Sequence, residues 1–154
     1  MIEILLSRCK RPVAVSLLAT LTFLLLQPAI AQSEKPAGVG QHIGTWKLVS
    51  TKYGDAKDFT QYSEDSTRMK LINPTHFTWL EIDNNSKKVL TSAGGTYTLE
   101  GETYTESLDF AGEGMAPYLG KAQKFTIRVE GDKLFQSGQL SDGLKIEENW
   151  VRVK

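Results

Sequence analysis

The feature that most constrains the fold is a series of short alternating segments that are separated by turn residues. The clearest is 122–130, in which Phe125, Ile127 and Val129 alternate with polar and charged residues. Strict alternation of this kind is typical of a strand with one buried face. Because helical spacing of apolar residues is almost absent after residue 31, the sequence predicts an all-β domain.

Turn residues divide this pattern into eight expected strands. Proline and small polar residues favour turns, and they cluster between the alternating segments, for example at 73–74 and 83–86. The pair Gly94-Gly95 interrupts one long strand, where we expect a bulge or a barrel corner. The expected strands are 45–53, 67–72, 75–83, 88–100, 102–110, 122–130, 133–140 and 144–153.

The order of these strands favours a closed barrel. Consecutive hairpins need no long crossover, and closure of the sheet removes exposed strand edges. We therefore expect an eight-stranded antiparallel up-and-down barrel, with a β-sandwich as the alternative. In the first strand Trp46, Leu48 and Ser50 share one face. The two long connections, 54–65 and 111–121, are expected to be mainly loops, and 54–65 is a candidate to cross a barrel mouth.

A targeting signal occupies the start of the chain. Three basic residues precede an apolar run at 13–26, and the small residues Ala29 and Ala31 follow it. This order is that of a secretory signal peptide. We expect cleavage after Ala31, which makes 1–31 a signal peptide and places the mature protein in the periplasm or outside the cell. A retained anchor is the alternative, although the apolar run is short for a membrane span.

Charge and cysteine content narrow the functional classes of the mature chain. We expect a flexible N-terminus at 32–43, which contains glycine and proline, followed by the barrel domain at 44–154. Removal of 1–31 takes away Cys9 and changes the balance of 18 basic and 18 acidic residues to 15 and 17. No excess of positive charge remains, so no nucleic-acid partner is expected.

The opening of the first strand resembles a known family. Gly44-Thr45-Trp46 is similar to the G-x-W that begins the first barrel strand in the lipocalin and wider calycin group. The runs 75–79 and 94–99 are similar to small exported bacterial lipocalin-like proteins of unassigned function. The chain shows no second or third lipocalin motif and no disulfide, so it resembles the outlying lipocalin-like group.

This resemblance implies a structural role for one end of the barrel and a cavity inside it. In the group, an arginine of the last strand packs across the tryptophan of the first, and Arg152 matches it by position. Gly44, Trp46, Trp150 and Arg152 are therefore expected to close the barrel floor, with a cation over an indole face. The resemblance implies a ligand cavity and names no ligand.

Hairpin registers predict which polar side chains face the interior. A two-residue turn at 131–132 and a three-residue turn at 141–143 place Gln136 beside Glu148 on the apolar face of their strands. The same registers direct Arg128 to solvent. One polar neighbour pair inside the barrel is therefore expected.

A second inward carboxylate follows from the strand 102–110. Glu106 shares a face with Tyr104, Leu108 and Phe110, and a two-residue turn would place Tyr97 opposite Tyr104. A buried carboxylate needs a partner, a raised pKa or water. Two inward glutamates therefore predict a wet or liganded interior.

We expect this polar set to hold the polar end of a small hydrophobic or amphipathic ligand, with a purely structural hydrogen-bonded network as the alternative. For His76 the two faces of its strand are both mixed, so its direction stays open. The candidate ligand-binding residues are Tyr97, Tyr104, Glu106, Gln136, Glu148 and His76.

Two other functional classes stay open. Phe59, Tyr62 and Tyr118 lie in the long connections and would suit a protein-interaction or inhibitor module. An isomerase or cyclase using Glu106 or Glu148 as a base is the third reading. No metal-ligand spacing, phosphate loop or nucleophile elbow is present, so we expect no metal or cofactor and assign no catalytic residue.

Overall fold

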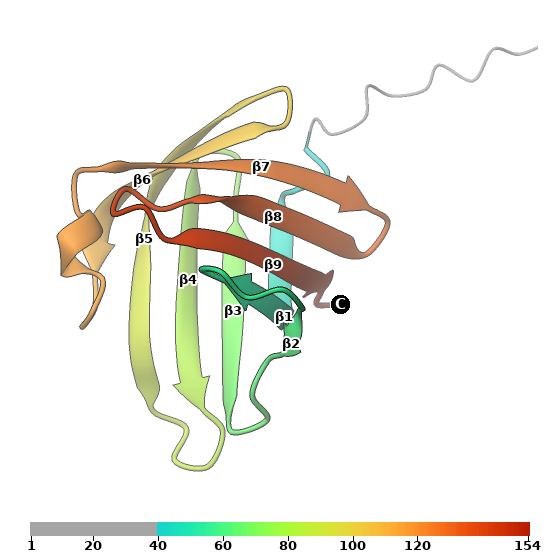
Figure 1. The fold of residues 1–154 in the computed structure, drawn as a ribbon, viewed down its shortest axis with the longest axis vertical. Coiled ribbons are helices and arrows are strands. Elements are labelled where there is room, and N and C mark those ends of the chain that lie inside the picture. The colour runs from blue at the N-terminus through green and yellow to red at the C-terminus, as the bar shows by residue number, and fades with distance from the viewer. Residues whose placement is uncertain (1–39) are drawn as a thin grey trace, which may run out of the picture. The chain divides into compact units, whose positions relative to one another are not determined.

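Residues 40–154 form a closed antiparallel β-barrel in the computed structural model (Figure 1). The structure describes these residues only, so the predicted signal peptide at 1–31 lies outside them. The elements are β1 (Gly44–Tyr53), β2 (Thr60–Gln61), β3 (Ser66–Ile72), β4 (His76–Asp83), β5 (Val89–Glu100), β6 (Thr103–Ala111), the 3-10 helix η1 (Ala116–Tyr118), β7 (Ala122–Glu130), β8 (Lys133–Gln139) and β9 (Lys145–Arg152).

Pairing between the first and last strands closes the sheet. From β3 to β9 each strand pairs with the next, while β1 pairs with both β3 and β9. The predicted eight-stranded up-and-down barrel is therefore confirmed. The short strand β2 is an addition within the predicted loop 54–65, and it pairs only with β1.

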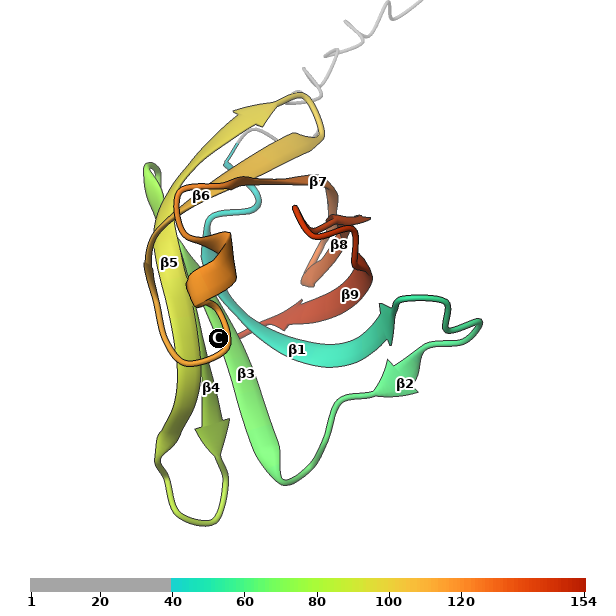
Figure 2. The same cartoon turned by 60° about the vertical axis from the view of Figure 1, so that its left-hand side comes forward.

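Two walls of the barrel cross at a steep angle. Figure 1 shows β3, β4 and β5 running along one wall, while β7, β8 and β9 cross in front of them. Figure 2 shows β1 curving from the first wall towards the second. This curvature allows β1 to pair with β3 near its start and with β9 along most of its length.

The predicted break in the long strand β5 is present at Gly94-Gly95. The register with β6 shifts between these two glycines, and a Cβ atom on Gly95 would lie 2.0 Å from the backbone oxygen of Ser107. Close approach of β6 therefore requires glycine here. The same shift turns Phe110 outward, where it is exposed. The predicted inner position of Phe110 is wrong because the bulge reverses the alternation.

The predicted registers hold for the hairpins from β7 to β9. Val129 pairs with Leu134, and Gln136 pairs with Glu148. The tight turns lie at Gly131-Asp132 and at 141–143, as expected. The turn residues therefore determine which residues pair.

The predicted pairing of Tyr97 with Tyr104 is wrong by two residues. Tyr97 pairs with Glu106 instead, because the β5–β6 turn is centred on Gly101 and Glu102, where Gly101 has a positive φ of 62°. A shift of two leaves every side chain on its original face. The rings of Tyr97 and Tyr104 accordingly still pack, with centroids 4.8 Å apart.

One end of the barrel is closed by an aromatic and cationic stack. The Arg152 guanidinium lies 4.1 Å from the centre of the Trp46 ring, which is fully buried. Gly44 has a φ of 144°, and a Cβ atom there would meet Arg152 Nη1. The predicted packing of Arg152 across Trp46 is therefore observed, and glycine at 44 makes room for it.

Residues 41–43 lie against this floor. Arg152 donates hydrogen bonds to the backbone oxygens of Gln41 (2.6 Å) and Ile43 (2.9 Å), and Trp46 Nε1 donates to the backbone oxygen of His42 (2.7 Å). His42 itself is buried. These residues were expected in a flexible N-terminus, but side chains of β1 and β9 hold them in place.

Candidate functional site

The barrel encloses a cavity of about 360 Å³. This volume lies within the usual range for small-molecule sites. Apolar walls come from both sides of the barrel and include Trp79, Leu108, Phe125, Leu140, Ile146 and Trp150. Polar side chains gather in the same space, and they include Tyr53, Arg68, Lys70, Glu106, Gln136 and Glu148.

A lysine lies at the centre of the polar group. Lys70 on β3 is 2% exposed, and its Nζ lies 2.5 Å from Glu106 Oε1 and 2.7 Å from Gln136 Oε1. The ammonium also lies over the rings of Tyr104 and Trp150, at 5.4 and 5.7 Å from their centres. Lys70 thus supplies the partner that a buried Glu106 requires.

Burial has the largest effect on the pKa of Glu106. Loss of solvation raises the pKa of this carboxyl above its ordinary value, although the charge and hydrogen bond of Lys70 oppose the shift. The negative charge of Glu148 raises the pKa further. Both glutamates line the same cavity, where their like charges repel each other.

A second charged pair lies beside the first. Arg68 Nη2 is 2.5 Å from Glu81 Oε2, and Arg68 Nη1 donates to the Tyr53 hydroxyl at 3.3 Å. Burial opposes the ionisation of Glu81, but hydrogen bonds and charge from Arg68 hold the pKa of Glu81 below its ordinary value. This pair is ionised and compensated at neutral pH.

Glu148 differs from the other two glutamates because its partner is neutral. The Tyr53 hydroxyl donates a hydrogen bond to Glu148 Oε1, and burial together with the Glu148 charge raises the pKa of Tyr53 above its ordinary value. Glu148 is itself buried and lines the cavity. Beside it in the lining, the indole Nε1 of Trp150 is buried and has no hydrogen-bond partner among residues 40–154.

Three of the six predicted ligand residues line the cavity together. They are Glu106, Gln136 and Glu148, which project from β6, β8 and β9. Their contact with a ligand stays a prediction, but the expected polar cluster exists.

The other three predicted residues lie elsewhere. Tyr104 is completely buried and does not line the cavity. Tyr97 lies towards the floor, where its hydroxyl donates to the backbone oxygen of Asn73 (2.7 Å) and contacts His42 Nε2 (2.9 Å). His76 is exposed beside Thr75 because β4 directs Phe77 and the residues alternating with it inward. These positions do not fit ligand contact inside the cavity.

Tyr53, Arg68, Lys70 and Gln123 also line the cavity, although the sequence pattern did not identify them. On β3 the inner face carries Arg68 and Lys70 while the outer face carries Met69 and Leu71, so the alternation of apolar residues favoured the opposite face. A bulge in β1 after Leu48 shifts the register against β9 and brings Tyr53 opposite the inward Ile146. The predicted inner face of Leu48 and Ser50 therefore ends at this bulge.

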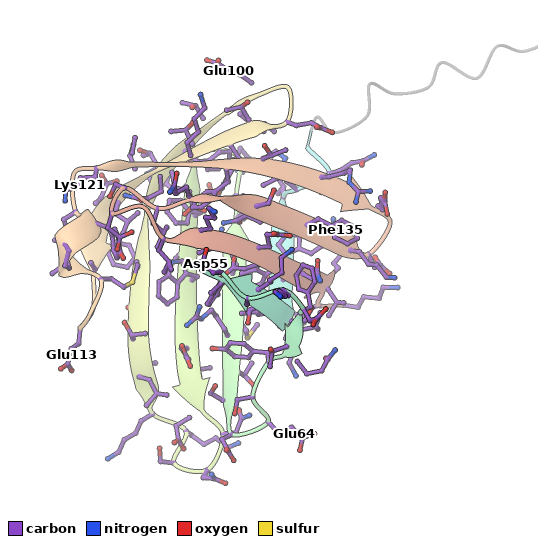
Figure 3. All side chains as sticks on the ribbon, in the orientation of Figure 1. Asp55, Glu64, Glu100, Glu113, Lys121 and Phe135 are labelled. Atoms are coloured by element: carbon purple, nitrogen blue, oxygen red, sulfur yellow. The ribbon has the colours of Figure 1, made fainter. Side chains whose placement is uncertain are left out.

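The connection between β6 and β7 covers one opening of the cavity. Figure 3 shows Glu113 and Lys121 at opposite ends of this connection. Met115 and Tyr118 line the cavity, and the Tyr118 hydroxyl donates to Asp142 Oδ2 at 2.6 Å. This cover therefore consists of residues 113–118 and is anchored through Asp142.

The other long connection stays away from the cavity. None of residues 54–65 lines it, and β2 ties them to the outer part of β1. Phe59 is exposed beside Lys52, whose Nζ lies 5.2 Å from its ring centre. The expectation that 54–65 crosses the mouth is therefore wrong, because 113–118 occupies that place.

No group of three or more histidine, cysteine, aspartate or glutamate side chains within residues 40–154 is placed to hold a metal ion. No helix in the same range is long and apolar enough to cross a membrane.

A family model described as a domain of unknown function, DUF4488, matches residues 41–154. The search of curated proteins found no match. A solved lipocalin-like protein from Bacteroides uniformis is 14% identical, with a TM-score of 0.54, over 74% of this chain and 100% of that chain. An uncharacterized protein from Bacteroides eggerthii is 11% identical, also with a TM-score of 0.54, over 72% and 98%. The fold is lipocalin-like.

Proposed function

The chain belongs to the DUF4488 family over residues 41–154, and we propose that it is a carrier of a small, largely apolar molecule held inside the barrel. The observation that carries this proposal is the cavity of about 360 Å³ between apolar walls. Protein interiors are normally close-packed, so a core serving stability alone would fill this space with side chains.

The polar group at the inner end of the cavity supports a ligand with one polar end. Glu148 and Gln136 offer acceptor atoms there, and Trp150 Nε1 offers a donor without a protein partner in the described chain. Apolar pockets with few convergent polar groups orient ligands in this way. The rest of the ligand would lie against Leu108, Phe125 and the neighbouring walls.

A cavity-filling variant tests the proposal. Leu140→Trp adds an indole to the lining, whereas Val89→Trp adds the same group at a position that is 59% exposed and outside the cavity. We expect decan-1-ol to bind the natural protein and Val89→Trp, and to bind Leu140→Trp at least about tenfold more weakly, as measured by calorimetric titration. Equal affinity in all three would contradict binding in the cavity.

The interaction-module reading has less support from the same residues. Tyr118 packs towards the cavity and Tyr62 packs against the core, which leaves Phe59 as the exposed aromatic of the three. An interior cavity that side chains leave unfilled also favours a carrier over a protein-interaction module with a close-packed core. The positions of these residues therefore support the carrier function better than the interaction module.

We further propose that the carrier acts in the periplasm or outside the cell. Support comes from the order of basic, apolar and small residues in 1–31. Intact mass measurement of the protein from its own host is expected to give a chain that begins at Gln32. A chain that retains 1–31 would favour the anchored form instead.

A further inference from the structure

We propose that the ligand carries a protonated amine, and that Glu148 is the residue that binds this ammonium group. The inference rests on the proposed carrier function and names the chemistry of its ligand. It depends on the balance of charge around the cavity. The charged side chains that line it are Arg68, Lys70, Glu106, Glu113 and Glu148, and Glu81 forms an ion pair with Arg68.

Both cations already have carboxylate partners. Arg68 is held by Glu81 and Lys70 by Glu106, each with nitrogen and oxygen 2.5 Å apart. Lys70 additionally donates to Gln136. A carboxylate ligand would have to displace one of these partners, and leaving a buried glutamate without its cation is costly.

Glu148 is the carboxylate within the barrel that lacks a cationic partner in the described chain. It accepts a hydrogen bond from the neutral Tyr53 hydroxyl, and one carboxylate can accept several. The side chain is 6% exposed. A buried carboxylate gains most from a charge-assisted donor, which an ammonium group supplies.

The surrounding lining suits the same group. Glu113 adds a further negative charge in the cover over the opening. An incoming anion would meet repulsion from Glu113 and Glu148, whereas an ammonium group would be attracted to both.

Three ligands with one chain length test this inference. Decylamine, decan-1-ol and decanoic acid differ only in the head group, and each is used at pH 7 below its solubility limit or micelle concentration. We expect the natural protein to bind the amine at least about tenfold more tightly than the acid, with the alcohol between them. This comparison needs no variant, so it stands even if a substitution disturbs folding.

Adjacent glutamates on β9 provide a matched pair of variants. Glu148→Gln is expected to weaken amine binding at least about tenfold while alcohol binding changes less than about threefold. Glu147→Gln, on the outer face where Glu147 pairs with Lys52, should change neither. Thermal unfolding of each variant establishes that the comparison is made between folded proteins.

The outcomes separate the two proposals. Acid binding as tight as amine binding, or amine binding that survives Glu148→Gln, would overturn the ammonium inference while leaving the carrier function in place. Failure of all three ligands to bind would overturn the carrier function as well.

Discussion

Lys70 shows how one buried side chain organises the interior. It projects from β3 and contacts Glu106 on β6 and Gln136 on β8, so a single ammonium connects strands from both walls. Such a group is rarely buried without a partner, because desolvation of a charge costs several kcal/mol. Its position therefore depends on Glu106.

Removal of Lys70 alone should destabilise the barrel. In Lys70→Met a buried Glu106 loses its counter-charge, and we expect the free energy of unfolding at pH 7 to fall by about 3 kcal/mol. The double variant Lys70→Met/Glu106→Leu should recover at least half of this loss. Urea unfolding measures both, and a double variant no more stable than Lys70→Met would contradict the pairing.

Glu106 should also give stability a specific pH dependence. Because burial raises its pKa in the folded state, the fold binds its proton more tightly than the unfolded chain does. The contribution of Glu106 is therefore fully present below its unfolded pKa of about 4.3 and is lost as pH rises through its folded pKa.

The variant Glu106→Gln isolates this effect. We expect the unfolding free energy of the natural protein, minus that of Glu106→Gln, to decrease as pH rises above about 4.3. Thermal or urea unfolding at several pH values measures the difference. A difference that increases with pH would show that the folded-state pKa is lowered instead.

At the scale of elements, the cover at 113–118 controls access to the cavity. It is anchored by Tyr118 to Asp142 near the start of β9, and Thr91 of β5 donates a hydrogen bond to the backbone oxygen of Glu113 at 2.9 Å. Both anchors are at the surface, where hydrogen bonds contribute little to overall stability. We therefore expect the cover to open as a local unit while the barrel stays folded.

Loss of the Tyr118 anchor should speed ligand exchange. In Tyr118→Phe the ring remains in the lining but its hydrogen bond to Asp142 is absent, so we expect faster dissociation of a bound decyl ligand and a stability change below about 1 kcal/mol. Stopped-flow displacement measures the rate. Ser63→Ala removes a hydroxyl from the other connection and should leave the rate unchanged; an equal effect there would contradict the role of the cover.

The elements themselves were largely predictable from sequence because their signals are local. Alternation and turn residues located the barrel strands to within about one residue at each end, and the turn at Gly131-Asp132 fixed the register of β7 with β8. Bulges were predictable only where glycine marks them. The pair Gly94-Gly95 predicted the bulge between β5 and β6, whereas no glycine marks the bulge after Leu48 in β1.

At the scale of the whole molecule, the inward carboxylates were predictable and their partners were not. Gln136 and Glu148 follow from two tight hairpins, so local turn chemistry places them. Lys70 meets Gln136 across 66 residues of sequence, and the apolar residues Met69 and Leu71 of its strand lie on the outer face. Long-range side-chain pairing of this kind depends on barrel closure, which no local pattern specifies.

We predict that the interior of the barrel is a binding site for a small molecule. Native mass spectrometry of protein purified from its own host, compared with the same sample after denaturation, tests this most directly. We expect an added mass of a small amphipathic molecule that disappears on denaturation and is absent from Leu140→Trp. A single unliganded mass, together with no thermal shift of the natural protein by decylamine, decan-1-ol or decanoic acid, would contradict the carrier function.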